Sequence, residues 1–244
     1  MADALAPFCV LAGGLATRLG ERARREPKAL MVVAGRPFIF HQLELLRSHG
    51  ARRIVLCVGH LGERVRDAVG DGSALGLDVR YSFDGPRPIG TAGAVREALP
   101  LLDERFYVLY GDTYLRIDYA AVSDAFVASG KPALMTVLRN EGRWDTSNVL
   151  YSDGAVIAYD KREPTAEMRW IDYGLGVLTA EAVTTAAPDA ADLADVYSEL
   201  AARGELAGYE ATERFYEIGT PAALAETDAF LREHADAAAH PPDR

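Results

Sequence analysis

The chain has few cysteines, no long apolar run and no excess of positive charge. Two cysteines, Cys9 and Cys57, occur among its 244 residues, each in a short apolar segment. Two such residues cannot build a disulfide framework or a four-ligand zinc site, so we interpret both as reduced core residues. No run approaches the roughly 18 apolar residues of a membrane helix, and the initial segment MADALAPFCV lacks a basic start. We expect a cytoplasmic protein without a membrane partner.

Acidic residues outnumber basic ones, with 36 Asp+Glu against 26 Lys+Arg and a formal net charge of -10. Nucleic acids and anionic membranes attract basic surfaces through counterion release, so this balance argues against nucleic acid as a partner. Any phosphate site must then be a local group of basic residues. The histidines give no pair with convincing metal-ligand spacing.

Short runs of β-branched and aromatic residues alternate with segments of helical period in the first part of the chain. This alternation is typical of βαβ units and predicts an α/β fold with a largely parallel sheet. The expected strands are Phe8 to Ala12, Arg53 to Val58, Val79 to Phe83, Phe106 to Tyr110 and Ala133 to Leu138. The expected helices lie between Pro37 and Gly50, over Thr91 to Leu99 and over Ala120 to Ala128.

The pattern changes beyond about residue 140. Val149 to Tyr151 and Ala155 to Tyr159 flank Ser152-Asp153-Gly154, which predicts an antiparallel hairpin. We interpret residues 140–178 as an insertion over one end of the sheet.

The remaining segments complete a single unit. Strands are expected at Ile171 to Leu178 and Phe215 to Ile218, and a last helix is expected from Thr220. No internal repeat or long linker divides the chain. Residues 1–235 are therefore expected to form one domain, followed by a disordered tail over residues 236–244.

The segment VLAGGLATRLGERARREPK, from Val10 to Lys28, carries the strongest chemical signal. A strand is expected to end at Gly13-Gly14, where two residues without Cβ let backbone N–H groups approach an anion. Arg18 and Lys28 can then supply positive charge to phosphates. The segment predicts a triphosphate cradle, with Leu11, Ala12, Gly13, Gly14 and Thr17 as candidates for nucleotide binding.

Two segments, AGGLATRL and EPKALMVVAGRPF, together resemble the signature of the sugar-1-phosphate nucleotidylyltransferases. These enzymes join a nucleoside triphosphate to a sugar 1-phosphate and release pyrophosphate. The resemblance runs from about Val10 to Leu231, although the chain has Ala16 where Gly is usual. It implies a Rossmann-like, GT-A-like domain with a mostly parallel mixed sheet flanked by helices and a small β-hairpin insertion. It also implies Mg²⁺ as the cofactor.

Within this family, the nucleotide would also meet five residues outside the glycine loop or at its end. Arg18 would hold the departing β- and γ-phosphates, and Lys28 the reacting α-phosphate. Gly90 and Thr91, in Gly90-Thr91-Ala92-Gly93 at the start of an expected helix, would lie beside the nucleoside. Asp84 falls where relatives read the base, and its carboxylate could accept from both N1–H and the 2-amino group of guanine. GTP is therefore favoured.

The metal and the sugar phosphate would meet a second group of residues. Asp112 directly follows an apolar strand, at the edge where open α/β sheets bind ligands, and is a candidate Mg²⁺ ligand. In the family a later acidic residue, here Glu217, completes the metal site. Lys161 resembles the lysine that contacts the sugar 1-phosphate. Asn148 and Asp172 match polar positions that relatives direct at sugar hydroxyls.

The insertion is most similar to the D-glycero-D-manno-heptose 1-phosphate guanylyltransferases. We expect GTP-dependent transfer to a heptose- or mannose-type sugar 1-phosphate, in polysaccharide or glycoconjugate biosynthesis. UTP- or CTP-dependent transfer to another sugar phosphate stays open. A non-catalytic protein that binds nucleotide sugars is the alternative of another class, disfavoured because Arg18, Lys28 and Asp112 occur together. Strand edges in the insertion could also pair two copies into a homo-oligomer.

Overall fold

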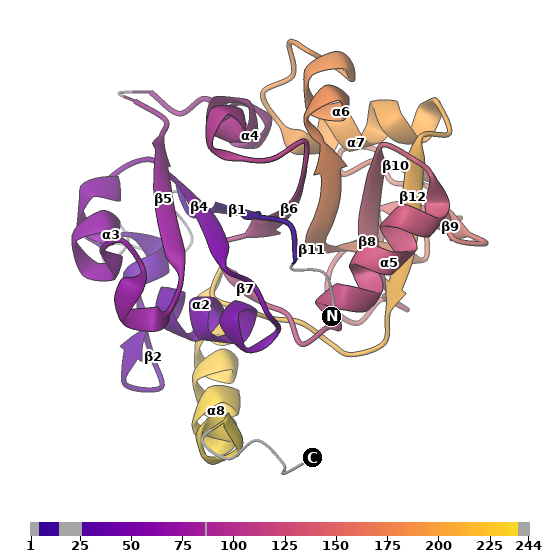
Figure 1. Ribbon diagram of the computed structural model, residues 1–244. Coiled ribbons are helices and arrows are strands. Elements are labelled where there is room, and N and C mark those ends of the chain that lie inside the picture. Colours follow the sequence, from indigo (N-terminus) through magenta and orange to yellow (C-terminus); the bar gives the residue numbers. More distant parts are fainter. Residues whose placement is uncertain (1–4, 15–25, 86, 239–244) are drawn as a thin grey trace.

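The computed structural model describes residues 5–14, 26–85 and 87–238. Nine of its strands form one mixed sheet, which has helices on both faces (Figure 1). They are β1 (Phe8–Leu11), β4 (Arg53–Val58), β5 (Asp78–Phe83), β6 (Arg105–Tyr110), β8 (Ala133–Arg139), β9 (Val149–Ser152), β10 (Ala155–Tyr159), β11 (Trp170–Thr179) and β12 (Leu206–Ala211). Their order in the sheet is β5-β4-β1-β6-β11-β8-β12-β10-β9. The predicted α/β fold is confirmed.

The half of the sheet that contains β1 is parallel. β5, β4, β1 and β6 all run in one direction, as expected for successive βαβ units. Beyond β6 the sheet becomes mixed, because β11 is antiparallel to both β6 and β8. The carboxyl ends of the four parallel strands meet at one edge, so the loops that follow them converge there.

The predicted hairpin forms between β9 and β10. Its turn contains Asp153 and Gly154, which both have positive φ, at 50° and 77°. β10 pairs with β12, and β9 also meets β11 where Val149 lies opposite Trp170. The Asn148 N–H donates to the Trp170 carbonyl over 2.9 Å at the same place. The hairpin thus folds back on the sheet. The edge of β9 near Val149 is paired with β11 of the same chain.

Helices cover both faces of the sheet (Figure 1). One face packs against α2 (Phe38–Ser48), α3 (Gly62–Val69) and α5 (Tyr119–Ser129). The other packs against α4 (Gly90–Ala98), α6 (Ala180–Thr185) and α7 (Leu193–Ala202). No helix in the described ranges is long and apolar enough to cross a membrane.

The last helix, α8 (Pro221–Ala238), projects from the lower side of the body in Figure 1. Residues 236–238, which the sequence assigned to a disordered tail, are helical. The rest of that expected tail lies outside the described residues. The shorter elements are η2 (Lys28–Leu30), β2 (Val32–Val33), β3 (Arg36–Pro37), η3 (Ser73–Leu75), η4 (Leu99–Leu101), β7 (Thr113–Tyr114) and β13 (Tyr216–Glu217).

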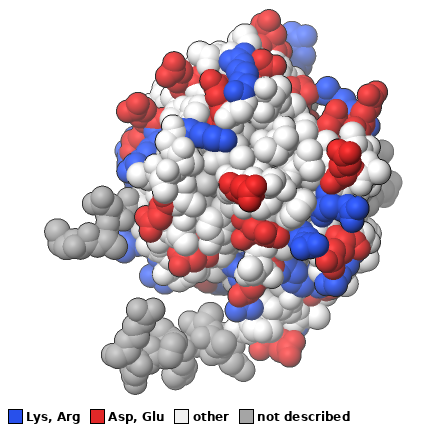
Figure 2. Space-filling model, turned by 90° about the vertical axis from the view of Figure 1, so that its right-hand side faces the viewer, with Lys and Arg blue, Asp and Glu red and all other residues white. Residues whose placement is uncertain are grey.

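Acidic and basic side chains are interspersed on the surface that Figure 2 presents, around and within a broad uncharged area. This face therefore offers no continuous basic stripe of the kind that holds a nucleic acid backbone.

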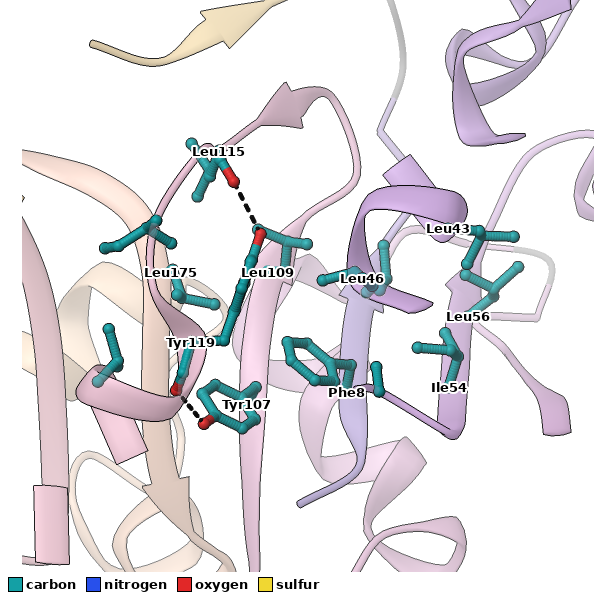
Figure 3. Close-up of a cluster of buried hydrophobic side chains, with 14 of the residues drawn as sticks. Phe8, Leu43, Leu46, Ile54, Leu56, Tyr107, Leu109, Leu115, Tyr119 and Leu175 are labelled. Atoms are coloured by element: carbon teal, nitrogen blue, oxygen red, sulfur yellow. Dashed lines mark hydrogen bonds between the residues drawn. The ribbon is translucent and has the colours of Figure 1, made fainter. Parts of the chain in front are cut away.

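Alternate residues of β1 face two different apolar clusters. Phe8 belongs to the cluster that contains α2 and α5, and Cys9 to the cluster on the opposite face. The Phe8 ring stacks on Tyr107, with ring centroids 4.3 Å apart. The Tyr107 hydroxyl donates to the Tyr119 carbonyl over 2.7 Å (Figure 3), so this buried phenol is satisfied. Cys9 and Cys57 are buried free thiols, as predicted.

The first turn of α4 docks on the segment that precedes α7. Gly90 has a φ of 77°, and a Cβ atom there would lie only 2.2 Å from the Ala191 carbonyl oxygen. The Thr91 hydroxyl donates to Asp192 Oδ1 over 3.0 Å and accepts from the Leu193 N–H over 2.7 Å. Asp192 also caps α7 by accepting from the Ala194 N–H. These contacts fix the backbone that leads into α4.

Replacing Asp192 with Ala removes the cap of α7 and the acceptor of Thr91. We expect the free energy of unfolding to fall by about 1–2 kcal/mol, since losing an N-cap typically has this effect. Denaturant unfolding followed by circular dichroism measures it. Asp189→Ala changes an exposed residue of the same loop and should alter the value by less than about 0.5 kcal/mol. Equal losses in both variants would contradict the capping role.

Candidate active site

A cavity of about 850 Å³ opens at the carboxyl ends of β1, β4, β5 and β6. Most of the predicted nucleotide and catalytic residues line it: Leu11, Ala12, Gly13, Gly14, Lys28, Asp84, Gly90, Thr91 and Asp112. The converging loops of the parallel strands bring these distant segments together. Thr17 and Arg18, the other two candidates for the phosphates, lie outside the described residues.

Asp84 lies above a close contact between two glycine backbones. A Cβ atom added at Gly13 would lie 3.0 Å from the Gly59 nitrogen, and one added at either glycine would lie 3.1 Å from Asp84 Oδ2. No described residue forms a salt bridge or hydrogen bond with the Asp84 carboxylate. Burial raises the pKa of this carboxyl above its usual value. The cavity therefore contains a partly desolvated acceptor without a partner in the described part of the chain.

The side chain of Thr91, unlike that of Asp84, already has hydrogen-bond partners within the protein. Its hydroxyl is engaged by Asp192 and Leu193, as described above, although the residue borders the cavity. Any contact that Thr91 makes with a ligand in this conformation must involve its backbone or methyl group.

Lys28 and Asp112 form an ion pair at the end of β6. Lys28 begins η2, directly after Pro27, and its side chain is mostly buried, with 14% of its surface exposed against 32% for Asp112. The pair joins the first motif of the sequence to the predicted metal-binding strand end, although 84 residues separate them.

Glu217 lies beside this ion pair. It belongs to β13, where it is opposite Thr113 of β7, and the next residue, Ile218, donates its N–H to the Asp112 carbonyl over 3.0 Å. A Cβ atom added at Gly219 would lie 2.5 Å from Glu217 Oε2 and 3.3 Å from Lys28 Nζ. The Glu217 carboxylate and the Lys28 ammonium thus both lie beside the Gly219 backbone.

Two carboxylates around one lysine suit a magnesium ion that is also bound by phosphate. Mg²⁺ in proteins is typically held by one or two carboxylates together with phosphate oxygens and water. Asp112 and Glu217 provide that number. No group of three or more His, Cys, Asp or Glu side chains arranged around a common point occurs among the described residues, so these offer no complete protein cage for a metal.

Lys161 approaches the same place from the insertion. Its Nζ lies 3.4 Å from Asp172 Oδ2, and 5.4 Å and 5.6 Å from the ring centroids of Tyr110 and Tyr159. Tyr110 also lines the cavity, so Lys161 lies beside a residue of the cavity wall. The ammonium is held by a carboxylate and two aromatic faces, which restricts its position.

Asp172 and Asn148 are both engaged within the protein. The Asp172 carboxylate is 6% exposed, accepts from the Tyr159 hydroxyl over 3.1 Å and accepts from the Gly174 N–H over 2.9 Å. Asn148 Oδ1 accepts from the Asp172 N–H over 3.1 Å. In this conformation Asp172 is the counter-ion of Lys161, and its predicted contact with sugar hydroxyls stays a prediction.

Several residues of the cavity were absent from the sequence prediction. Gly59, His60 and Leu61 follow β4, and Tyr110 ends β6. All of them lie at the carboxyl ends of parallel strands, so the rule that places ligands at this edge could have indicated them. No recognisable motif marks His60 or Leu61.

Known proteins resemble this chain in sequence and in fold. Residues 9–147 match the family model described as nucleotidyl transferase. The chain is 40% identical over 116 residues to N-acetylmuramate alpha-1-phosphate uridylyltransferase of Neisseria meningitidis. The aligned residues make up 46% of this chain and 49% of that protein. The chain is 30% identical over 154 residues to D-glycero-alpha-D-manno-heptose 1-phosphate guanylyltransferase of Campylobacter jejuni, covering 63% and 67%. The match thus spans about half of the first relative and two thirds of the second.

A solved structure extends the likeness to nearly the whole fold. The inositol-1-phosphate CTP transferase from T. maritima superimposes with a TM-score of 0.74 at 19% identity, over 96% of this chain and 98% of that one. At this identity the likeness supports the fold alone. The sequence match covers the glycine loop, Lys28, Asp84 and Asp112, which the fold brings to one cavity. The chain belongs to the nucleotidyl transferase family.

Proposed function

We propose that this chain transfers a nucleoside monophosphate from a nucleoside triphosphate to a sugar 1-phosphate, forming a nucleotide sugar and pyrophosphate. The observation that carries the proposal is the meeting of Lys28, Asp112 and Glu217 at the end of β6, with Lys161 beside Tyr110. One lysine and two carboxylates suit the triphosphate with its magnesium ion. A second lysine nearby suits another phosphate.

The cavity favours GTP among the nucleotides. A guanine base offers two donors on one edge, N1–H and the 2-amino group, and the unpaired Asp84 carboxylate can accept both. Bonding to two donors would compensate the desolvation that raises its pKa. The names of the relatives include guanylyl and uridylyl transferases, so the family admits more than one base. A UTP- or CTP-dependent enzyme is the alternative that Asp84 disfavours.

The sugar phosphate would bind on the insertion side. Lys161 is the cation available there, and its pairing with Asp172 holds it beside Tyr110. A heptose- or mannose-type sugar is favoured, in agreement with the likeness to the Campylobacter heptose 1-phosphate enzyme. Asn148 and Asp172 would border the sugar ring.

The reaction requires positioning and charge neutralisation more than proton transfer. An oxygen of the sugar 1-phosphate attacks the α-phosphorus in line, a new P–O bond forms, and the bond to the β-phosphate oxygen breaks so that pyrophosphate leaves. The nucleophile is already an anion, so no strong general base is needed. Lys28 would stabilise the charge on the α-phosphate, and Arg18 that on the leaving group.

Asp112 and Glu217 would hold Mg²⁺ at the end of β6. When bound, the ion would neutralise phosphate charge and fix the triphosphate in one orientation. The two carboxylates and the Lys28 ammonium lie close enough for all three to act on one triphosphate.

The decisive experiment measures pyrophosphate release with Mg²⁺ for GTP, UTP, CTP, ATP and dTTP, each combined with heptose, mannose and other hexose 1-phosphates. Release that requires GTP together with one sugar phosphate is the expected result. Release with a sugar phosphate and UTP or CTP, but not with GTP, would overturn the preference for GTP. No release with any pair, while nucleotide sugars still bind, would identify a non-catalytic binding protein.

Removing a charge at the end of β6 should abolish most of the turnover. We expect Lys28→Ala and Asp112→Asn each to lower kcat at least about a hundredfold, because one electrostatic stabiliser typically contributes this much. Lys131→Ala and Asp103→Asn change the same residue types at the opposite end of the sheet and should keep near-normal kcat. Steady-state kinetics on all four variants, with thermal unfolding as a check of folding, provides the test. Near-normal turnover in Lys28→Ala or Asp112→Asn would refute the site.

Asp84→Asn should weaken the preference for GTP. Asn keeps one acceptor oxygen but loses the charge, so we expect kcat/KM for GTP to fall about tenfold or more, as for loss of a hydrogen bond to a charged group. Values for UTP should change little. Asp78→Asn, on the exposed first residue of β5, is the matched control. Equal effects on GTP and UTP would contradict base recognition by Asp84.

The stability of Asp84→Asn should also depend on pH differently from that of the wild type. Because burial raises the folded-state pKa of Asp84, its ionisation opposes folding, and stability is lost as the pH rises from the unfolded-state pKa through the folded one. Asp84→Asn should remove this loss and unfold at a higher temperature than the wild type at pH 7. Melting temperatures of both proteins between about pH 4 and 7 measure the difference.

A further inference from the structure

Gln42 is a polar residue in the middle of an otherwise apolar stripe of α2. Its neighbours on the stripe, Ile39, Leu43 and Leu46, are fully buried, and Gln42 itself is 1% exposed. Taking an amide side chain out of water is unfavourable unless its polar atoms find partners. An apolar residue would suit this position of the helix better, so the contacts of the amide must account for it.

The amide nitrogen of Gln42 bonds to the turn that carries Asp112. Nε2 donates to the Tyr110 carbonyl over 2.9 Å and to the Thr113 carbonyl over 2.7 Å. Both partners can only accept, so the NH₂ end must face the turn. These two carbonyls stand on either side of Gly111 and Asp112. One side chain from α2 thus links the two ends of the turn by hydrogen bonds.

The other end of the amide has no such partner. Gln42 Oε1 is buried and finds no donor in the part of the chain that the structure describes. A buried acceptor left without a donor is destabilising by about 1–3 kcal/mol. The position therefore retains a glutamine although it carries this penalty, and the only groups it serves among the described residues are the two carbonyls of the turn.

Other contacts hold single residues of this turn, among them the Lys28 ion pair with Asp112 and the strand pairing of Thr113 with Glu217. The Gly111 N–H donates to the Leu11 carbonyl over 3.1 Å, and the Asp112 carbonyl accepts from the Ile218 N–H. The Thr113 hydroxyl bonds to the Tyr110 carbonyl from within the turn. Among the described residues, Gln42 is the side chain outside the turn that contacts both of its ends.

We propose that Gln42 is a positioning residue that sets the orientation of Asp112 for magnesium. The inference rests on the proposed function, in which Asp112 binds the metal. A carboxylate ligand works only when its backbone is fixed, and groups that orient ligands typically change metal affinity by about 10–100-fold when removed. Gln42 fixes the turn by its two hydrogen bonds, without contact to the substrate.

Gln42→Met tests the role, since methionine is similarly long and unbranched but has no donor. Binding of Mn²⁺ to the protein with GTP but no sugar 1-phosphate, measured by electron paramagnetic resonance, reports on the site without turnover, because GTP supplies the phosphate ligands. We expect affinity to fall about tenfold or more. The Mg²⁺ concentration for half-maximal turnover should rise by a similar factor, while the KM for GTP at saturating Mg²⁺ stays within about twofold.

Leu46→Val is the matched control, because it disturbs the same buried stripe one turn further along and has no polar group that could bond to the Asp112 turn. It should lower the melting temperature and leave Mn²⁺ affinity within about twofold. If Gln42→Met binds Mn²⁺ as the wild type does, the positioning role is wrong. If Leu46→Val weakens Mn²⁺ binding as strongly, general destabilisation explains the effect and the proposal also fails.

Two further variants keep the outcomes distinct. Should Gln42→Met not fold, Gln42→Asn replaces it, because a side chain shorter by one methylene cannot reach both carbonyls, and the same loss of Mn²⁺ affinity is expected. Asp112→Asn separates this proposal from the function on which it rests. Unchanged Mn²⁺ affinity in Asp112→Asn would refute the metal site itself, whereas loss there combined with normal affinity in the Gln42 variants would refute only the role of Gln42.

Discussion

The close approach of two backbones, at the ends of β1 and β6, is the constraint on which the active site depends. A Cβ atom at Gly111 would lie 2.8 Å from the Leu11 carbonyl oxygen and 2.9 Å from the Ala12 Cα. Only glycine permits this contact. It brings the turn that carries Asp112 against the start of the glycine loop, so the proposed metal ligand and the proposed phosphate-binding loop lie side by side. Any larger residue would push the two strand ends apart and separate them.

Around this contact, two lysines of the candidate site are paired with anions of the same chain. Lys28 lies against Asp112, and Lys161 against Asp172. In a protein with a net charge of -10, such pairs hold the ammonium groups in place before any phosphate arrives. For Lys28, whose side chain is mostly buried, the pair also limits the penalty of desolvation, because the ammonium keeps a carboxylate within reach. Local ion pairs, one carboxylate to each lysine, thus preorganise these two side chains.

Much of the fold follows from local patterns, and the failures have identifiable causes. The strand Arg53–Val58 was predicted with its observed bounds, because a continuous β-branched run needs no tertiary context. β12 was missed, since LAGYEA has few β-forming residues. It is a strand because it pairs with β8 along its whole length, and because Gly208 leaves room for the Tyr151 ring, which a Cβ would approach to 2.5 Å. α3 was missed as well, since Leu61 precedes it in a left-handed conformation without a capping side chain.

The candidate site was predicted from motifs, and the structure distinguishes residues that packing requires from those that it does not. Gly90 and Thr91 look like nucleotide contacts in the sequence, yet Ala191, Asp192 and Leu193 already demand a glycine and a hydroxyl there. Their presence would be expected in this fold with or without a ligand.

Asp84 is the opposite case. No described side chain or backbone group pairs with its carboxylate, and burial makes its charge unfavourable in the free protein. A residue that lowers stability and serves no internal contact in the described structure needs an external partner to account for it. For this reason the inference of base recognition has a firmer physical basis at Asp84 than at the more conspicuous Gly-Thr-Ala-Gly motif.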